Sequence, residues 1–444
     1  MPLRPDPVVT AEQLEAGKHS LVLDAGWASV TGAFSSGVIL VAFALALGAN
    51  PVQIGLLAAI PFMAQAAQLP ATLLIERIRQ RRKIGVLVIT TARVIILSLA
   101  FLPFVPNLGI ALALLIAAQI AMAILHAVGA CAVNSWLHQL VPGAQLGNFF
   151  SQRLFWSTAL ACVGTLAAGF IVDQFPWTSG LHTYSIVFVI AGLTGFVSSF
   201  YLARAPEPLM QNGGPAVGMR TRVLAPFRDR NFRRLLVFMG AWNVASNLAA
   251  PFIAVYLMQQ LGYALTTVTA LWVISQIANA LTMYAWGRVS DRLSNKAILA
   301  AALPVYFLCT LGLVFVDAGQ PRPMQLSLLA VIHIVMGIAG GGIGLATGNL
   351  GLKLAPQGQG TAYLAAIGLV SAVAGGLAPI VAGSLAHFFQ ASELSAVVRW
   401  VSSTREGEIT VVRFAHWEFL FALSAALGLY VMHALSRVSE GSEI

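Results

Sequence analysis

The sequence predicts an all-α membrane protein with twelve transmembrane helices in two parallel six-helix halves. Apolar residues make up 58% of the 444 residues and charged residues only 9%, against roughly 25% charged in average soluble proteins. A soluble fold with so few charges cannot cover its surface with polar groups. The apolar residues form long unbroken runs, whereas a transmembrane β-barrel has short segments of alternating polarity. The spanning elements are therefore predicted to be helices.

The apolar runs give the positions of these helices, since about 20 apolar residues are needed to cross a bilayer. The predicted spans are 20–47, 54–75, 84–105, 109–138, 150–173, 182–203, 235–260, 266–287, 297–317, 324–352, 361–388 and 414–435. Two longer connections run from Arg204 to Arg234 and from Phe389 to Arg413. The predicted organisation is an N-terminal tail at 1–19, a half at 20–203, a linker at 204–234, a half at 235–436 and a tail at 437–444.

The distribution of basic residues predicts the orientation. With the N-terminus inside, twenty of the 25 Lys and Arg residues fall on the inner side. The outer loops hold four, namely Arg322, Arg399, Arg405 and Arg413. Cytoplasmic loops carry such an excess of positive charge, so both termini are predicted to be cytoplasmic. The net charge of +9 then reflects topology, and no nucleic-acid partner is expected.

The chain contains an internal repeat. Five pairs of matching residues lie 214 or 215 positions apart and, in chain order, are Trp27 with Trp242, Leu47 with Leu261, Glu76-Arg77 with Asp291-Arg292, Asn134 with Asn349, and Gly169 with Gly383. A common register over most of the chain predicts two similar halves in the same orientation. Parallel halves of this kind place a substrate path at their interface, near the bilayer midplane.

Two segments carry a family resemblance. The run Gly287-Arg288-Val289-Ser290-Asp291-Arg292, with Lys296 beyond it, resembles the loop signature of the major facilitator superfamily. The first-half copy departs from this pattern, because Thr72 and Arg79 stand where the signature has glycine and Glu76 where it has aspartate. The run from Asn134 to Arg153 is similar to the connection between the fourth and fifth helices of many bacterial members.

This resemblance implies a secondary active transporter of the bacterial inner membrane that moves a small solute by alternating access. The expected partners are the solute, the lipid bilayer, and protons or another coupling ion. A facilitative uniporter and a non-transporting scaffold that retains the fold remain as alternatives. No Ser-His-Asp pattern, Walker loop or dinucleotide fingerprint occurs in a suitable context. The chain is therefore not expected to be an enzyme or to bind a cofactor or metal.

Arg93 and Asp24 lie within predicted spans, where charge is costly and marks candidate functional residues. Arg93 is ten residues past Lys83, which places it ~15 Å into the membrane. It either ties helices together or takes part in anion binding or ion coupling. Asp24 is its predicted carboxylate partner, because an arginine side chain can extend several ångströms. Asp24 has an alternative role as an acidic group near the inner start of the first span.

Polar side chains recur at helical spacing on several other spans. They are Thr31, Gln65, Gln68, Gln119, His126, Asn243, Asn247, Gln276 and Asn279. Such side chains must face protein or water rather than lipid. Each one alone is best explained as a contact between helices, whereas the set together favours a polar substrate pathway. His126 is either an interhelical donor or a proton relay.

A second group of charges lies at the inner ends of the spans. The resemblance implies that Glu76-Arg77 and Asp291-Arg292 form a cytoplasmic gate between the halves. Arg153 is predicted to pair with Glu76, and Lys353 to lie near Asp291. Partly exposed pairs of this kind contribute about 1 kcal/mol each. That amount is small for folding but large for the balance between two conformations.

Overall fold

The computed structural model describes residues 5–6, 9–175, 180–210, 225–317, 319–356, 360–391, 394–401 and 406–440. Part of the predicted linker, 211–224, lies outside the described residues, as do parts of both predicted tails. The helices of the first part of the chain are α1 (Ala11–Ser35), α2 (Gly37–Ala46), α3 (Pro51–Met63), α4 (Gln68–Ile78), α5 (Arg81–Ser98), α6 (Leu108–Leu140), α7 (Gly143–Gln174) and α8 (Thr183–Arg204). Those that follow are α10 (Arg230–Val255), α11 (Leu265–Arg292), α12 (Asn295–Gly312), α13 (Arg322–Lys353), α14 (Gly360–Phe389) and α15 (His416–Ser436).

These helices confirm the predicted fold class. Over the described residues, 11 helices are long and apolar enough to cross a membrane, and up to 12 if one bent pair counts as a single span. The bent pair runs from Pro51 to Ile78 and changes direction by 45°. The break lies between Ala67 and Pro70, and Pro70 has no N–H to donate to a helical hydrogen bond there.

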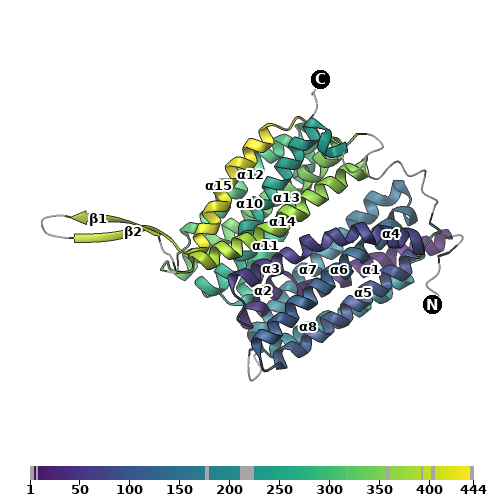
Figure 1. Cartoon of the computed structure of the whole chain (residues 1–444), viewed down its shortest axis with the longest axis horizontal. Helices are drawn as coiled ribbons and strands as arrows, with labels where there is room; N and C mark the ends of the chain where they lie inside the picture. The colour runs from purple at the N-terminus through teal and green to yellow at the C-terminus, as the bar shows by residue number, and fades with distance from the viewer. Residues whose placement is uncertain are drawn as a thin grey trace. The chain divides into compact units, whose positions relative to one another are not determined.

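A β-hairpin is the one feature of the fold class that the sequence analysis did not predict. The connection expected between 389 and 413 contains β1 (Leu394–Val401) and β2 (Glu406–Phe414), drawn beside the helices in Figure 1. The strands pair antiparallel, with a register shift between Ala396 and Val397. The residues of β2 include Ile409, Thr410, Val411 and Val412, and β-branched residues of this kind favour strands. The β-branched residues of this segment are therefore the feature of the sequence that indicates a strand.

The first compact unit comprises Met1–Ala49, Met63–Pro215 and Ala264–Thr269. Within it α1 packs against α7 and α8, while α5 packs against α6 and α8. Small residues permit the closest approaches, since a Cβ on Gly164 of α7 would lie 3.0 Å from that of Ala33 on α1. Such close packing is how helices associate in a membrane.

The second compact unit comprises Asn50–Phe62, Ala216–Tyr263 and Ala270–Ile444. Within it α10 packs against α14 and α15, and α12 packs against α13 and α15. The segment of α3 in this unit lies against α14, because a Cβ on Gly55 would overlap the Pro379 carbonyl and one on Gly383 would overlap that of Pro51. Trp286 of α11 donates its indole N–H to the Ile338 carbonyl of α13 at 2.8 Å.

Candidate functional site

A buried carboxylate lies in the first unit where three helices meet. Asp24 of α1 is only 6% exposed and accepts a 2.7 Å hydrogen bond from the Ser198 hydroxyl of α8. Its other oxygen lies 3.7 Å from the Arg153 guanidinium of α7. A buried charge must be paired and hydrogen-bonded to be tolerated, and here the two neighbouring helices supply both partners.

Arg93 of α5 adds a second guanidinium to this region. It is 6% exposed, and its charge acts on Asp24. The side chain crosses α8 at Gly195, where any Cβ would overlap it. Its Nη1 lies 3.4 Å from Nε2 of His126 on α6. Its buried Nε has no hydrogen-bond partner among the described residues. We call Asp24, Arg93, His126, Arg153 and Ser198 the charged cluster.

A cavity of about 870 Å³ lies next to this cluster, between α1 and α7. The chain neighbours of Asp24 and Arg153, Leu23 and Gln152, both line it. Trp27 and Trp156 contribute aromatic surface to the same walls. The walls of the cavity combine apolar surface with a few polar groups, which is characteristic of small-molecule sites.

The other predicted pathway residues have mixed surroundings. Thr31 is buried and its hydroxyl lies 3.2 Å from that of Thr194 on α8, so it connects two helices. Gln65 is exposed and Gln68 is half-buried. The buried amide nitrogen of Gln119 has no partner among the described residues.

In the second unit, Asn243 donates to the Ser371 hydroxyl at 3.2 Å, which joins α10 to α14. Asn247 bonds the Asn243 carbonyl one turn earlier. Asn279 lies against Gly341 of α13, where a Cβ would be 3.0 Å from its side-chain oxygen. Gln276 is half-buried. The contacts of Thr31, Asn243 and Asn279 show that part of the predicted pathway set holds helices together.

The charge pairs at the predicted gate differ from those expected. Arg153 pairs with Asp24 rather than with Glu76, because α1 packs directly against α7 and brings a buried carboxylate to it. Lys353 pairs with Glu440 at 3.2 Å rather than lying with Asp291. Glu76, Arg77, Asp291 and Arg292 are all exposed, and none of them forms an ion pair within the described part of the chain.

Glu207 is a functional candidate that the sequence analysis missed. It is fully buried just after α8 and accepts hydrogen bonds from the Arg81 and Arg82 backbone N–H groups at 2.7 and 3.1 Å. It therefore caps the N-terminus of α5, where helix N–H groups lack partners and a negative charge is favoured. The Arg81 side chain also pairs with it at 3.3 Å.

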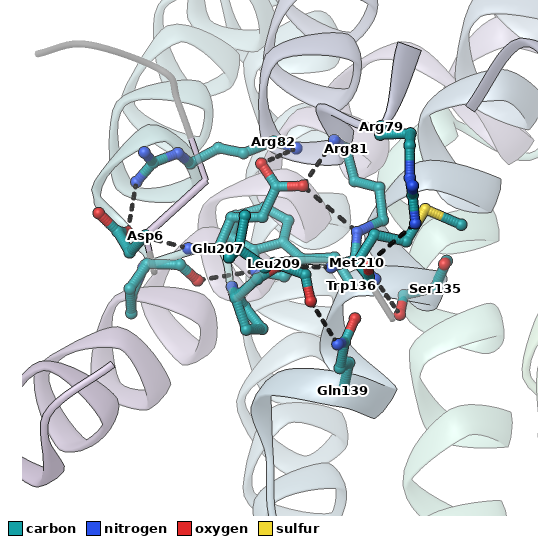
Figure 2. A network of polar contacts seen from close by, with 12 residues as sticks. Asp6, Arg79, Arg81, Arg82, Ser135, Trp136, Gln139, Glu207, Leu209 and Met210 are labelled. Atoms are coloured by element: carbon teal, nitrogen blue, oxygen red, sulfur yellow. Dashed lines mark hydrogen bonds and ion pairs between the residues drawn. The ribbon is translucent and has the colours of Figure 1, made fainter. Parts of the chain in front are cut away.

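The backbone of the chain that follows α8 is held against the first unit by hydrogen bonds to its carbonyl groups, some of which Figure 2 shows. Six consecutive carbonyls accept hydrogen bonds: that of Ala205 from Arg82, Pro206 from Trp136, Glu207 from the Asp6 backbone, Pro208 from Arg81, Leu209 from Gln139 and Met210 from Arg79. We call residues 205–210 the strap. Arg79, Arg81 and Arg82 thus have a structural role beyond topology.

Arg79 explains one departure from the loop signature. It lies at φ 57 and is the sole non-glycine residue with positive φ in the described part of the chain. Glycine adopts this left-handed conformation without a steric penalty, which accounts for the glycine in the signature. Here an arginine adopts the left-handed conformation, and its side chain bonds the Met210 carbonyl at 3.0 Å.

The second unit has a corresponding cap, also missed from the sequence. Glu440 follows α15 and accepts from the Asn295 and Lys296 backbone N–H groups of α12 at 3.0 and 2.7 Å. Burial alone raises the pKa of this carboxyl, but hydrogen bonds from Lys296, Asn295 and Lys353 outweigh it and hold the pKa below its usual value of 4.5. The two caps occupy matching places, since Arg81 and Asn295 are 214 positions apart.

Comparisons with known proteins agree with this architecture. A profile described as Major Facilitator Superfamily matches residues 25–379, and no curated protein matches the sequence. The structure is similar to a mutant of the nucleoside transporter NupG, with TM-score 0.68 and 12% identity over 96% of this chain and 98% of that one. It is also similar to a D-xylose-proton symporter, with TM-score 0.67 and 14% identity over 97% and 98%. A bacterial homologue of the lysosomal transporter Spinster gives TM-score 0.64 and 14% identity over 96% and 95%.

Proposed function

Because this chain belongs to the major facilitator superfamily and is a multi-pass membrane transporter rather than an enzyme, we propose that it moves a small solute across the bacterial inner membrane by proton-coupled secondary transport. Asp24 is the proposed coupling group. The observation that carries the proposal is the buried Asp24 carboxylate, which lies 3.7 Å from the half-buried Arg153 guanidinium. The buried Arg93 crosses α8 at Gly195, one turn before the Ser198 that bonds Asp24. The basic residues of the sequence support an orientation with both termini in the cytoplasm.

The charges of the cluster suggest how coupling works. When Asp24 is ionised it partly neutralises Arg153 and Arg93. When it is protonated, both guanidiniums lose their counter-charge in a site where unpaired charge is costly. An anionic group of a solute in the adjacent cavity would then replace the carboxylate. Proton binding and solute binding are thereby linked, and the excess of positive charge favours solutes that carry a negative charge.

The remaining polar residues complete the proposed pathway. Thr31, Gln65, Gln68, Gln119 and His126 contribute from the first half. Asn243, Asn247, Gln276 and Asn279 contribute from the second half, with a partial role in helix contacts. Glu76, Arg77, Asp291 and Arg292 form the proposed cytoplasmic gate. Their exposure and their lack of ion-pair partners among the described residues leave these four charges available for a second conformation.

The test is solute-driven proton movement in proteoliposomes that contain a trapped pH-sensitive dye. The panel comprises monosaccharides, nucleosides, and mono- and dicarboxylates. We expect an anionic solute to drive proton entry through the wild-type protein, and Asp24→Asn to abolish this signal without preventing membrane insertion. Ser198→Ala and Ser199→Ala form a matched pair, because only the Ser198 hydroxyl bonds Asp24, while the Ser199 hydroxyl has no partner among the described residues.

Three results would contradict the proposal. Uptake without proton movement, unchanged in Asp24→Asn, would identify a uniporter. Equal pH profiles for Ser198→Ala and Ser199→Ala would remove Asp24 from the coupling step. Failure of every solute in the panel to enter would favour the scaffold that retains the fold without transport.

A further inference from the structure

A second cavity, of about 570 Å³, lies in the second unit between the start of α10 and the end of α15. Its lining consists of Arg230, Arg233, Arg234, Ser436, Arg437 and Ser439. Four of these six residues are arginines and none is acidic. We call this cavity the arginine pocket. It shares no residue with the charged cluster or its cavity.

The floor of the arginine pocket is fixed by hydrogen bonds. Asn231 donates to the Ser439 carbonyl at 2.7 Å and accepts from the Ser439 N–H at 3.0 Å. This reciprocal pair holds the chain after α15 against the first turn of α10. Deeper in the unit, the Ser424 hydroxyl of α15 bonds the Ala245 carbonyl of α10. These hydrogen bonds fix the positions of α10 and α15, and therefore of the backbone that carries the arginines.

The arginine pocket carries a high density of positive charge. Arg230, Arg233 and Arg234 lie one turn apart on α10 and repel one another. They also sit at a helix N-terminus, where positive charge is unfavourable. Asp229 is close by, but one of its oxygens caps α10 by accepting from Asn231 and Phe232. Within the described residues, none of the four arginines forms an ion pair. An anion from outside the protein would relieve this repulsion.

The first unit shows that the fold does not require these arginines. At an offset of 215, Glu15, Lys18 and His19 occupy the positions of Arg230, Arg233 and Arg234. There Lys18 pairs with Glu15 at 2.5 Å, so the charge is balanced within the helix. At these matching positions, a cluster of arginines that form no ion pair with any described residue occurs in the second unit and not in the first.

The surroundings of the arginine pocket indicate a lipid as the source of the anion. Both α10 and α15 belong to candidate membrane spans. Val237 lies seven residues after Arg230, and Tyr430 seven residues before Arg437, so each shares a helix face with its arginine. Val237 is 48% exposed and Tyr430 is 53% exposed. The arginine pocket thus opens at the end of an exposed apolar stripe, as expected for a headgroup with its acyl chains alongside the protein.

We propose that the arginine pocket binds the phosphate headgroup of an anionic phospholipid. Arginine is suited to this role, because its planar guanidinium donates two parallel hydrogen bonds to phosphate oxygens. Basic pockets between transmembrane helices are known to accept such headgroups. The bound lipid offsets part of the positive charge of the four arginines and joins α10 to α15.

The test uses the purified full-length protein in detergent. Its thermal unfolding is followed during titration with phosphatidylglycerol, with phosphatidylcholine, and with inorganic phosphate alone. Native mass spectrometry reports retained lipid as a second measurement. The variant Arg233→Gln/Arg437→Gln removes two charges of the arginine pocket. The matched control Lys83→Gln/Arg204→Gln removes two charges at the ends of α5 and α8 in the first unit.

We expect phosphatidylglycerol to raise the unfolding temperature of the wild-type protein and of the control. The double variant should bind it about 30-fold more weakly, because each arginine near the surface adds roughly a fivefold preference. Phosphatidylcholine should give little stabilisation, since its headgroup has no net charge. Without lipid, the control should unfold at the wild-type temperature, and the double variant at that temperature or above it, because fewer arginines repel one another; either result shows that the variant folds.

Two outcomes would overturn the proposal. Equal loss of lipid binding in the double variant and in the control would show that general surface charge, rather than the arginine pocket, attracts the lipid. Stabilisation by micromolar inorganic phosphate that is as large as that by the lipid, and equally lost in the double variant, would assign the arginine pocket to a soluble phosphate compound.

Discussion

The Arg93 side chain can cross α8 because residue 195 is a glycine and has no Cβ. A Cβ at Gly195 of α8 would overlap the aliphatic part of Arg93, and Arg93 in turn acts on Asp24. We expect Gly195→Val to lower the unfolding free energy by about 1–3 kcal/mol through overpacking and to displace Arg93. Gly340→Val is the control, because a Cβ there meets no atom within 4 Å. Thermal unfolding of the two purified variants gives the comparison, and equal stability would contradict the assigned packing.

The Glu440 cap makes the stability of the second unit depend on pH. Since the folded pKa is held below 4.5, the carboxylate stabilises the folded state above that pH. The contribution is lost as pH falls through the lower, folded value. We expect Glu440→Gln to reduce the unfolding free energy at pH 7 by about 0.5–2 kcal/mol, as for the loss of other helix N-caps.

Measured against pH, the stability gap between wild type and Glu440→Gln should narrow below pH 4.5. Other carboxyl groups titrate in the same range, but they are common to both proteins and cancel in the difference. Denaturant unfolding in detergent at several pH values provides the data. A gap of constant size down to the acid limit would show that the carboxylate does not act as the cap.

At the scale of elements, the turn between α4 and α5 combines a strained backbone conformation with a hydrogen bond to a residue far along the chain. Arg79 holds φ 57 and bonds the strap at Met210. Arg79→Ala removes the contact and keeps the strained backbone, whereas Arg79→Gly removes both. We therefore expect the glycine variant to be more stable than the alanine variant by about 1 kcal/mol.

Both Arg79 variants should expose the strap to protease more than wild type does, because both lose the bond to Met210. Limited proteolysis followed by mass mapping around residues 205–210 measures this, and thermal unfolding measures the stability order. Alanine and glycine variants of equal stability would show that the positive φ is not retained in the variants.

The element scale also shows what the sequence could and could not predict. Hydropathy located the spans, because burial in a bilayer requires long apolar runs, whereas the two similar halves expected from the 215-residue repeat stay a prediction. The partners of buried charges were not predictable, because they depend on which helices pack together. Asp24 meets Arg153 through the packing of α1 on α7. Glu207 falls in the predicted linker, and its burial follows from a contact with a residue 126 positions away.

For the whole molecule, the proposed gate predicts a shift between conformations. Asp291→Asn and Glu76→Gln each remove one charge, and about 1 kcal/mol per pair would change a two-state population several-fold. We expect both variants to increase the reactivity of a cysteine placed at Ser157, four residues after Arg153, towards a thiol reagent from the cytoplasmic side. The native Cys131, Cys162 and Cys309 are replaced first.

The control for this labelling is Asp229→Asn, which also removes one carboxylate but lies outside the proposed gate, at the start of α10. A cysteine at Ser157 that reacts equally in all three variants and in the parent would mean that these charges set topology alone.

The two helix caps determine the order in which the protein can be completed during its synthesis. Glu207 is made 126 residues after Arg81, so at about 5–20 residues per second α5 is inserted ~6–25 s before its N-terminus can be capped. Glu440 follows Asn295 by 145 residues, which gives α12 a similar interval of ~7–29 s. Each half therefore leaves the ribosome with an uncapped third helix, and only the arrival of its own last helix completes it. A chain halted inside α8 or α15 would lack the carboxylate that caps the third helix of that half.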